Sequence, residues 1–385
     1  MSLGSSPAHP MPVASRSREA VGSLLRELRP DALVVVVFIV SRLLVVLAAL
    51  AAEFLLPRNP ALTSGASGPI LRSLTAWDGW YYLGIAAGGY QASPVAGEYS
   101  NFAFPPLYPL VVRLLALPFP AHQGLVAVLL ANLAFLIALV LLARLGTPFL
   151  GRRRAVLAAS LLAIYPFAWV YAMAYTESLF LLLMVAGFLA GERRHRAWAA
   201  VFIALATLCR LQGVVLVLPL LILMLRQDGW RPRPSLGWLV LVPAAAIAFL
   251  LYLAWVSGSL TAFLDAQRAW GREGLGGSAP GDTVVARFSP YQAALLLSLL
   301  WSVWLLVFVR VDRIRVEYVL VPVLFIAAEL SSGSLEAVGR VTMAFPYAWI
   351  LASRRSLFAR QAWPAVSVGV FMVTALLAFA GYWVP

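Results

Sequence analysis

Long apolar stretches separated by short polar segments run through the whole chain. The stretches lie near residues 31–54, 123–145, 155–174, 177–191, 197–211, 213–226, 237–257, 291–309, 316–331, 341–353 and 363–384. About 20 helical residues cross the apolar core of a bilayer, and the stretches lack the alternation of polar and apolar residues that a lipid-facing barrel needs. The pattern therefore predicts an all-α polytopic membrane protein with about 11 transmembrane helices, several of them short.

The composition agrees with a membrane protein. Of the 385 residues, 62% are hydrophobic and 12% are charged, and the mean hydropathy is +0.88, which exceeds what a soluble core could bury. We expect residues 1–30 to form a cytoplasmic tail and residues 31–385 a single transmembrane domain. Two long polar segments interrupt that domain, at 57–122 and 258–290. Within the first, residues 105–120 are bounded by prolines and too short to span, which predicts a juxtamembrane helix.

All 29 basic side chains of the chain are arginines, and their distribution predicts the orientation. If the N-terminal tail is cytoplasmic and each stretch reverses the chain, 20 of them fall in cytoplasmic segments. These are Arg16, Arg18, Arg26, Arg29, Arg144, Arg152, Arg153, Arg154, Arg193, Arg194, Arg196, Arg226, Arg231, Arg233, Arg310, Arg313, Arg315, Arg354, Arg355 and Arg360. By the positive-inside rule, the N-terminus is cytoplasmic and both long polar segments are extracytoplasmic. The clustering between apolar stretches thus indicates membrane orientation and argues against nucleic-acid binding.

Cysteine and histidine chemistry is restricted by the small number of these residues. The single cysteine, Cys209, excludes a disulfide within the chain. His9, His122 and His195 lie in separate segments without metal-ligand spacing. We therefore predict no cofactor and no metal site, although carboxylates alone can hold a hard cation.

The most unusual polar residue is Asp78, which stands among four aromatic rings in the segment AWDGWYY at residues 76–82. A carboxylate close to a membrane-length apolar stretch is tolerated where it faces water or a polar site. Asp78 is therefore a candidate functional residue. The alternative is a structural role as a helix N-cap or in a loop salt bridge.

Several extracytoplasmic segments, read in order, carry a family resemblance. They lie at residues 77–90, 102–110, 174–180, 266–272 and 334–346, and Arg210 accompanies them. Together they resemble the PIG-V-like mannosyltransferases, bacterial relatives of the enzyme that adds the second mannose in GPI-anchor assembly. One departure is FPP at residues 104–106, where a second Phe is expected before the proline, and this affects packing more than chemistry.

The resemblance implies a GT-C glycosyltransferase architecture, a polyprenyl-phosphate sugar as the donor, and an active site on the extracytoplasmic face. Such a donor already carries a good leaving group. The enzyme therefore needs a base to deprotonate the acceptor hydroxyl, and cationic groups to stabilise the phosphate. Asp78 is the natural general base, and its flanking rings suit stacking on a sugar.

Further residues are predicted to bind the substrate or the donor. Arginine suits the phosphate because its planar fork grips two oxygens, so Arg340 and Arg272 are the first candidates, with snorkelling to lipid headgroups as the alternative. Arg42 and Arg210 lie in or near apolar stretches and need a partner such as Glu53 or Glu177, or a wet site. Glu177 is either a site carboxylate or a helix-start residue. The predicted binding set is Trp77, Trp80, Tyr81, Tyr82, Glu177, Arg210, Gln267, Trp270, Arg272 and Arg340, in which Gln267 and Trp270 line the acceptor path.

The sequence therefore predicts a membrane glycosyltransferase, most simply an inverting α-mannosyltransferase that uses a polyprenyl-phosphate donor. A GT-C enzyme for another lipid-linked sugar, such as arabinose or an amino sugar, fits the same motifs. A lipid or sugar transporter or flippase fits the composition, but its polar groups would gather near the midplane and its halves would repeat. The expected partners are the lipid-linked donor, membrane lipids, and a glycolipid, glycan or protein acceptor.

Overall fold

The computed structural model describes residues 30–57, 68–91, 99–270, 272, 290–307, 314–332 and 362–382, and this part of the chain is helical and contains no strand. Its α-helices are α2 (Pro30–Leu55), α3 (Pro69–Leu74), α4 (Asp78–Gly88), α5 (Leu107–Ala116), α6 (Gln123–Leu150), α7 (Arg152–Ala163), α8 (Glu177–Glu192), α9 (Arg196–Cys209), α10 (Val217–Gln227), α11 (Leu241–Ser257), α12 (Ala262–Ala269), α14 (Pro290–Val307), α15 (Val316–Ser331) and α18 (Trp363–Phe379). Five 3₁₀ segments accompany them: η2 (Asn101–Ala103), η3 (Pro120–His122), η4 (Ala168–Ala172), η5 (Leu211–Leu216) and η6 (Pro234–Val240).

The prediction of an all-helical membrane protein is confirmed. Among the described residues, three helical segments are long and apolar enough to cross a membrane: Ala32–Leu55, Pro120–Leu150 and Pro234–Ser257. Large apolar side chains cover their outer faces, with Leu43 63%, Leu129 59% and Trp255 81% exposed. Such surfaces suit lipid, because soluble monomers rarely expose apolar patches of this extent. The count of about 11 spans stays a prediction.

Most of the predicted stretches within the described residues match helices to within a few residues, but 155–174 does not. The stretch 341–353 lies outside the described residues. Helix α7 ends at Ala163, and the following residues continue irregularly into η4. Pro166 accounts for the break, because proline lacks an N–H and clashes with the carbonyl of residue i−4. The juxtamembrane helix predicted at 105–120 is present as the shorter α5.

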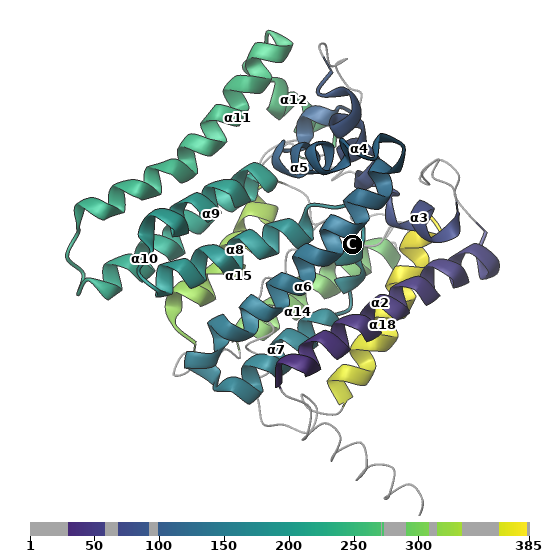
Figure 1. Ribbon diagram of the computed structural model, residues 1–385, viewed down its shortest axis with the longest axis horizontal. Helices are drawn as coiled ribbons and strands as arrows, with labels where there is room; N and C mark the ends of the chain where they lie inside the picture. The colour runs from purple at the N-terminus through teal and green to yellow at the C-terminus, as the bar shows by residue number, and fades with distance from the viewer. Residues whose placement is uncertain are drawn as a thin grey trace, which may run out of the picture.

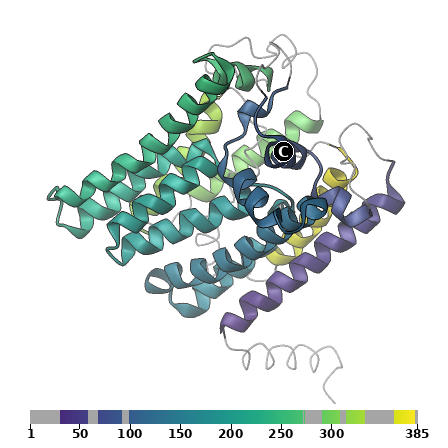
Figure 2. The ribbon, with the colours of Figure 1, turned by 45° about the horizontal axis from the view of Figure 1, so that its top comes forward.

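Helices α8 and α9 form the tightly packed centre of the bundle. A Cβ added to Gly187 of α8 would lie 2.7 Å from Cδ1 of Ile203 on α9. Glycine therefore lets the two backbones approach closely, as small residues do in membrane helix pairs. On another side of the bundle, α2 and α18 run side by side (Figures 1 and 2).

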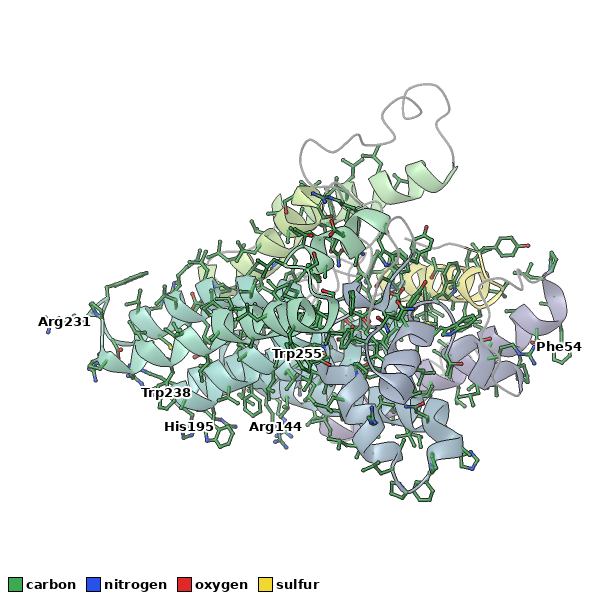
Figure 3. The ribbon with its side chains drawn as sticks, turned by 90° about the horizontal axis from the view of Figure 1, so that it is seen from above. Phe54, Arg144, His195, Arg231, Trp238 and Trp255 are labelled. Atoms are coloured by element: carbon green, nitrogen blue, oxygen red, sulfur yellow. The ribbon has the colours of Figure 1, made fainter. Side chains whose placement is uncertain are left out.

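One end of the bundle is rich in arginines. There Arg315 pairs with Glu192 and Arg226 with Glu317, each at 3.1 Å. Arg194, Arg196 and Arg233 surround the buried Asp228, and the hydrogen bond from Arg196 is the main cause that lowers the pKa of that carboxyl. His195 and Arg231 lie at this end of the molecule and Phe54 at the opposite end (Figure 3).

Short helices bring polar residues together at the other end of the bundle. Helices α8 and α15 have 16 residues each and α9 has 14, so they are only about 21–24 Å long at about 1.5 Å per residue. The apolar core of a bilayer is about 30 Å thick. Each of these helices is therefore shorter than the apolar core of a bilayer is thick. Helices α4, α5 and α12 lie over that end of the bundle at the top of Figure 1.

Candidate active site

Asp78 is held by a tight turn that comes immediately before α4. Trp77 has φ 58° and ψ −129°, a backbone conformation that glycine usually adopts, and the N–H of Gly79 closes the turn on the carbonyl of Ala76 at 3.1 Å. Strain of this kind persists where the surroundings fix it, and it clusters at functional sites. Here the indole Nε1 of Trp77 donates to the carbonyl of Ala378 on α18 at 2.8 Å.

Asp78 is the first residue of helix α4 and is only partly exposed. The N-cap position belongs to Trp77, which makes no capping hydrogen bond through its side chain, so the alternative of Asp78 as the N-cap is wrong. As the first helical residue, Asp78 places its negative charge at the positive end of the helix dipole. Its backbone N–H donates to the hydroxyl of Tyr175 at 3.2 Å, which ties α4 to the start of α8.

Two tyrosines beside Asp78 remain protonated. Burial raises the pKa of Tyr81, and the charge of Asp78 raises it further. Burial also raises the pKa of Tyr82 well above its usual range, a shift that Arg210 opposes and that Asp78 and Glu177 reinforce. Both phenols are therefore hydrogen-bond donors at neutral pH, and neither is a plausible base.

Arg210 links the acid Glu177 to the residues around Tyr82. Its Nη1 lies 2.7 Å from Oε1 of Glu177 and donates to Oγ1 of Thr176 at 3.2 Å. Thr176 in turn shares a 3.3 Å hydrogen bond with the hydroxyl of Tyr82. Of the partners considered for Arg42 and Arg210, the structure pairs Arg210 with Glu177. Glu177 is both a helix-start residue and a member of this cluster, so its two interpretations are compatible.

The position of Arg210 is set by the end of α9 at Cys209, after which the chain turns into η5. The N–H of Gly213 donates to the carbonyl of Arg210 at 2.8 Å. A Cβ on Gly213 would lie 2.7 Å from the backbone nitrogen of Thr207, so only glycine fits this return.

Glu329 is a buried acid of the cluster that the sequence analysis missed. It lies near the end of α15 and is 1% exposed. Nε2 of Gln212, two residues after Arg210, donates to Oε1 of Glu329. The charges of Glu177, Glu329 and Asp78 all act on the guanidinium of Arg210. The signal that could have identified Glu329 is an acid inside the apolar stretch 316–331, because such residues are functional candidates by default.

A cluster of aromatic rings joins the first polar loop to α12. The ring of Tyr81 stacks on Phe104 at 4.9 Å and meets Trp270 edge-on at 5.3 Å between ring centroids. Trp270 also contacts Tyr99 at 4.5 Å, and Nε2 of Gln267 donates to the carbonyl of Ala103 at 3.4 Å. Segments around residues 104, 176 and 270 therefore converge on the start of α4, whose first residue is Asp78.

Not every predicted binding residue joins this cluster. Trp80 is 62% exposed and makes no ring contact with the cluster among the described residues, which suits a membrane-interface tryptophan better than a binding residue. Trp77 uses its indole to contact α18, so it positions Asp78. Arg272 lies beside Gln267, with Nη1 of the arginine donating to Oε1 of the glutamine at 3.1 Å. Arg340 lies outside the described residues.

Arg42 does not pair with Glu53 or Glu177. Its guanidinium donates to Oδ1 of Asn132 at 3.1 Å and to the carbonyl of Ala168 at 3.4 Å, and it lies over the rings of Phe38 and Phe135. These contacts tie α2 to α6 and η4. Arg42 therefore has a structural role in the bundle.

Within the described part of the chain, no group of three His, Cys, Asp or Glu side chains lies close enough to hold a metal ion. Glu177 is paired with Arg210, and Glu329 accepts a hydrogen bond from Gln212. The chemistry that this arrangement supports is proton transfer at Asp78, next to phenolic and guanidinium donors.

The fold is similar to that of an archaeal oligosaccharyltransferase. The apo crystal structure of the oligosaccharyltransferase of Archaeoglobus fulgidus is 14% identical over 94% of this chain and 57% of that one, with a TM-score of 0.53. ArnT from Cupriavidus metallidurans, solved with undecaprenyl phosphate, is 14% identical over 90% of this chain and 76% of that one, with a TM-score of 0.42. The chain thus spans just over half the length of the archaeal enzyme.

No curated protein matches the sequence. The model of one protein family does match the sequence. The matched residues include Asp78, Glu177 and Arg210 and end before α12. This model, described as Mannosyltransferase (PIG-V), matches residues 33–227, which is just over half of the 385 residues. The chain therefore belongs to the PIG-V mannosyltransferase family.

Proposed function

We propose that the protein is an inverting α-mannosyltransferase. It transfers mannose from a polyprenyl-phosphate donor to an acceptor hydroxyl on the extracytoplasmic face of the cell membrane. The observation that carries the proposal is that three distant segments, around residues 104, 176 and 270, converge on the start of α4 at Asp78. There Tyr82, Thr176, Glu177 and Arg210 are linked to one another. Membership of the mannosyltransferase family supports the choice of sugar.

The reaction follows from the chemistry of these residues. The carboxylate of Asp78 accepts the proton of the acceptor hydroxyl as the hydroxyl oxygen attacks the anomeric carbon of the donor sugar. The bond from that carbon to the phosphate oxygen breaks, and the lipid phosphate leaves with the electron pair. Aromatic faces such as that of Tyr81 hold the sugar, and the predicted binding residues Arg272 and Arg340 are the candidates for the donor phosphate. No cofactor or metal takes part in this proposal.

Transfer by the reconstituted protein tests the activity and its stereochemistry. We expect protein in liposomes to move labelled mannose from a β-linked polyprenyl-phosphate donor to membrane acceptors, and we expect the product to be α-linked because a single displacement inverts the anomeric centre. An α-specific mannosidase should therefore release the label. A β-linked product would indicate a covalent intermediate, with Glu177 as the candidate nucleophile. Transfer of arabinose or an amino sugar in place of mannose would support the alternative donors, and movement of intact lipid without transfer would indicate a flippase.

Labelling of single cysteines tests the proposed orientation. In a Cys209→Ser background, we expect Gln91→Cys to react with an impermeant maleimide in intact cells and Arg152→Cys to react only after lysis. Both positions are exposed, so a difference in labelling reports the side of the membrane. The reverse pattern would place Asp78 on the cytoplasmic side, where lipid-linked donors and soluble nucleotide sugars would have to be considered together.

A further inference from the structure

The segment after α12 is fixed to the first polar loop through Gln267. The backbone N–H groups of Trp270 and Arg272 both donate to the carbonyl of Gln267 at 3.0 Å. The side chain of Gln267 donates to the carbonyl of Ala103 and accepts from Nη1 of Arg272. This glutamine therefore sets the position of the arginine next to the aromatic cluster that includes Tyr81.

Two buried donors in this segment are unused. Nε1 of Trp270 and Nε of Arg272 have no hydrogen-bond partner in the structure. Burying a donor without an acceptor is costly, so two such groups only two residues apart indicate that an acceptor is missing here. Among the described residues, no carboxylate forms an ion pair with Arg272.

The other arginines of the region are engaged differently. Arg210 is paired with Glu177, and the charges of Glu329 and Asp78 also act on it, so a phosphate there would meet three acids. Arg268, on α12, is 62% exposed and pairs with Asp265 at 2.8 Å. Among these arginines, Arg272 combines an unused Nε–H with a position two residues after Trp270, whose ring contacts Tyr81.

We propose that Arg272 and Trp270 bind the phosphate group of the lipid-linked donor, a role that rests on the proposed function. With Nη1 held by Gln267, the Nε–Nη2 edge of Arg272 is left to grip two phosphate oxygens, which is the geometry that favours arginine over lysine. The indole N–H of Trp270 supplies a third donor. In this proposal, the residues that bind the phosphate are separate from the acidic residues Asp78, Glu177 and Glu329. The acceptor hydroxyl is deprotonated at Asp78.

Binding of undecaprenyl phosphate, without sugar or turnover, tests this role. We would titrate the purified full-length protein with this lipid in detergent and measure occupancy by native mass spectrometry, with uncharged undecaprenol as the reference ligand. We expect Arg272→Ala to weaken phosphate binding by at least about tenfold, Arg272→Lys to weaken it less, and Trp270→Phe to weaken it about threefold. Arg268→Ala is the matched control and should bind like the wild type. Thermal unfolding of each variant verifies that it is folded.

The proposal is overturned if folded Arg272→Ala binds undecaprenyl phosphate as well as the wild type does. It is also overturned if undecaprenol binds as tightly as the phosphate, or if Arg268→Ala weakens binding as much as Arg272→Ala. Because the measurement needs no mannose, a protein that transfers another sugar would still lose phosphate binding in Arg272→Ala. Conversely, a mannosyltransferase whose Arg272→Ala variant binds normally would refute this role of Arg272 and leave the proposed function intact.

Discussion

Replacing Asp78 by asparagine should reduce turnover by about two orders of magnitude or more, because the amide keeps the shape of the side chain but cannot accept the proton. The fold should survive, since the turn that holds residue 78 depends on the backbone of Gly79 and on the contact from Trp77 to α18. Transfer of mannose from a synthetic polyprenyl-phosphate donor measures the effect.

Two comparisons make this result specific. Asp78→Glu should be nearly as inactive, because a longer side chain displaces the base and a shift of about 1 Å can cost about a hundredfold in rate. Binding of undecaprenyl phosphate should remain close to that of the wild type in both variants. Near-normal transfer by Asp78→Asn would exclude Asp78 as the general base and would leave it a structural residue at the start of α4.

The sequence was sufficient to predict the helical membrane architecture, and it singled out several polar residues that the fold brings close together. Apolar stretches identify transmembrane helices because the bilayer demands length and hydrophobicity, and most helix bounds follow them. Asp78 was identified by its setting, an acid among aromatic rings beside an apolar stretch. The cost of a lone charge in such a region predicts a partner or a wet site for both Arg42 and Arg210. The structure pairs Arg210 with Glu177 at 2.7 Å.

Other features of the site depend on tertiary contacts that no local pattern encodes. The aromatic residues at 77 and 80 look equivalent in sequence, yet Trp77 donates to Ala378, about three hundred residues away, and Trp80 is exposed. Glu329 resembles any acid near a helix end until α15 is packed against η5 and Gln212. The end of α7 at Ala163 depends on Pro166, a local signal that hydropathy alone does not register.

Removing the side chain of Arg210 should have the largest effect on stability. Arg210 pairs with Glu177, which is 7% exposed, and the charge of Glu329, which is 1% exposed, also acts on it. Loss of one partner of a buried ion pair costs about 3–5 kcal/mol because the other charge is left uncompensated. Arg210→Ala should therefore unfold at a markedly lower temperature than the wild type in thermal scans of the detergent-solubilised protein. Arg268→Ala, which breaks an exposed pair, should cost at most about 1 kcal/mol.

Arg210 is a single cation near three acids, so a double-mutant cycle with Glu177 tests their interaction more sharply. Glu177→Gln removes one acid but leaves Arg210 near Glu329 and Asp78, so this variant should be less destabilised than Arg210→Ala. The double variant Arg210→Ala/Glu177→Gln should recover part of the stability lost in Arg210→Ala, because it removes the buried charge that the single variant leaves unpaired. Thermal unfolding of all three variants under one protocol provides the cycle. Strictly additive losses would mean that the two side chains do not interact energetically, and Arg210 would then be free to bind an anionic ligand such as the donor phosphate.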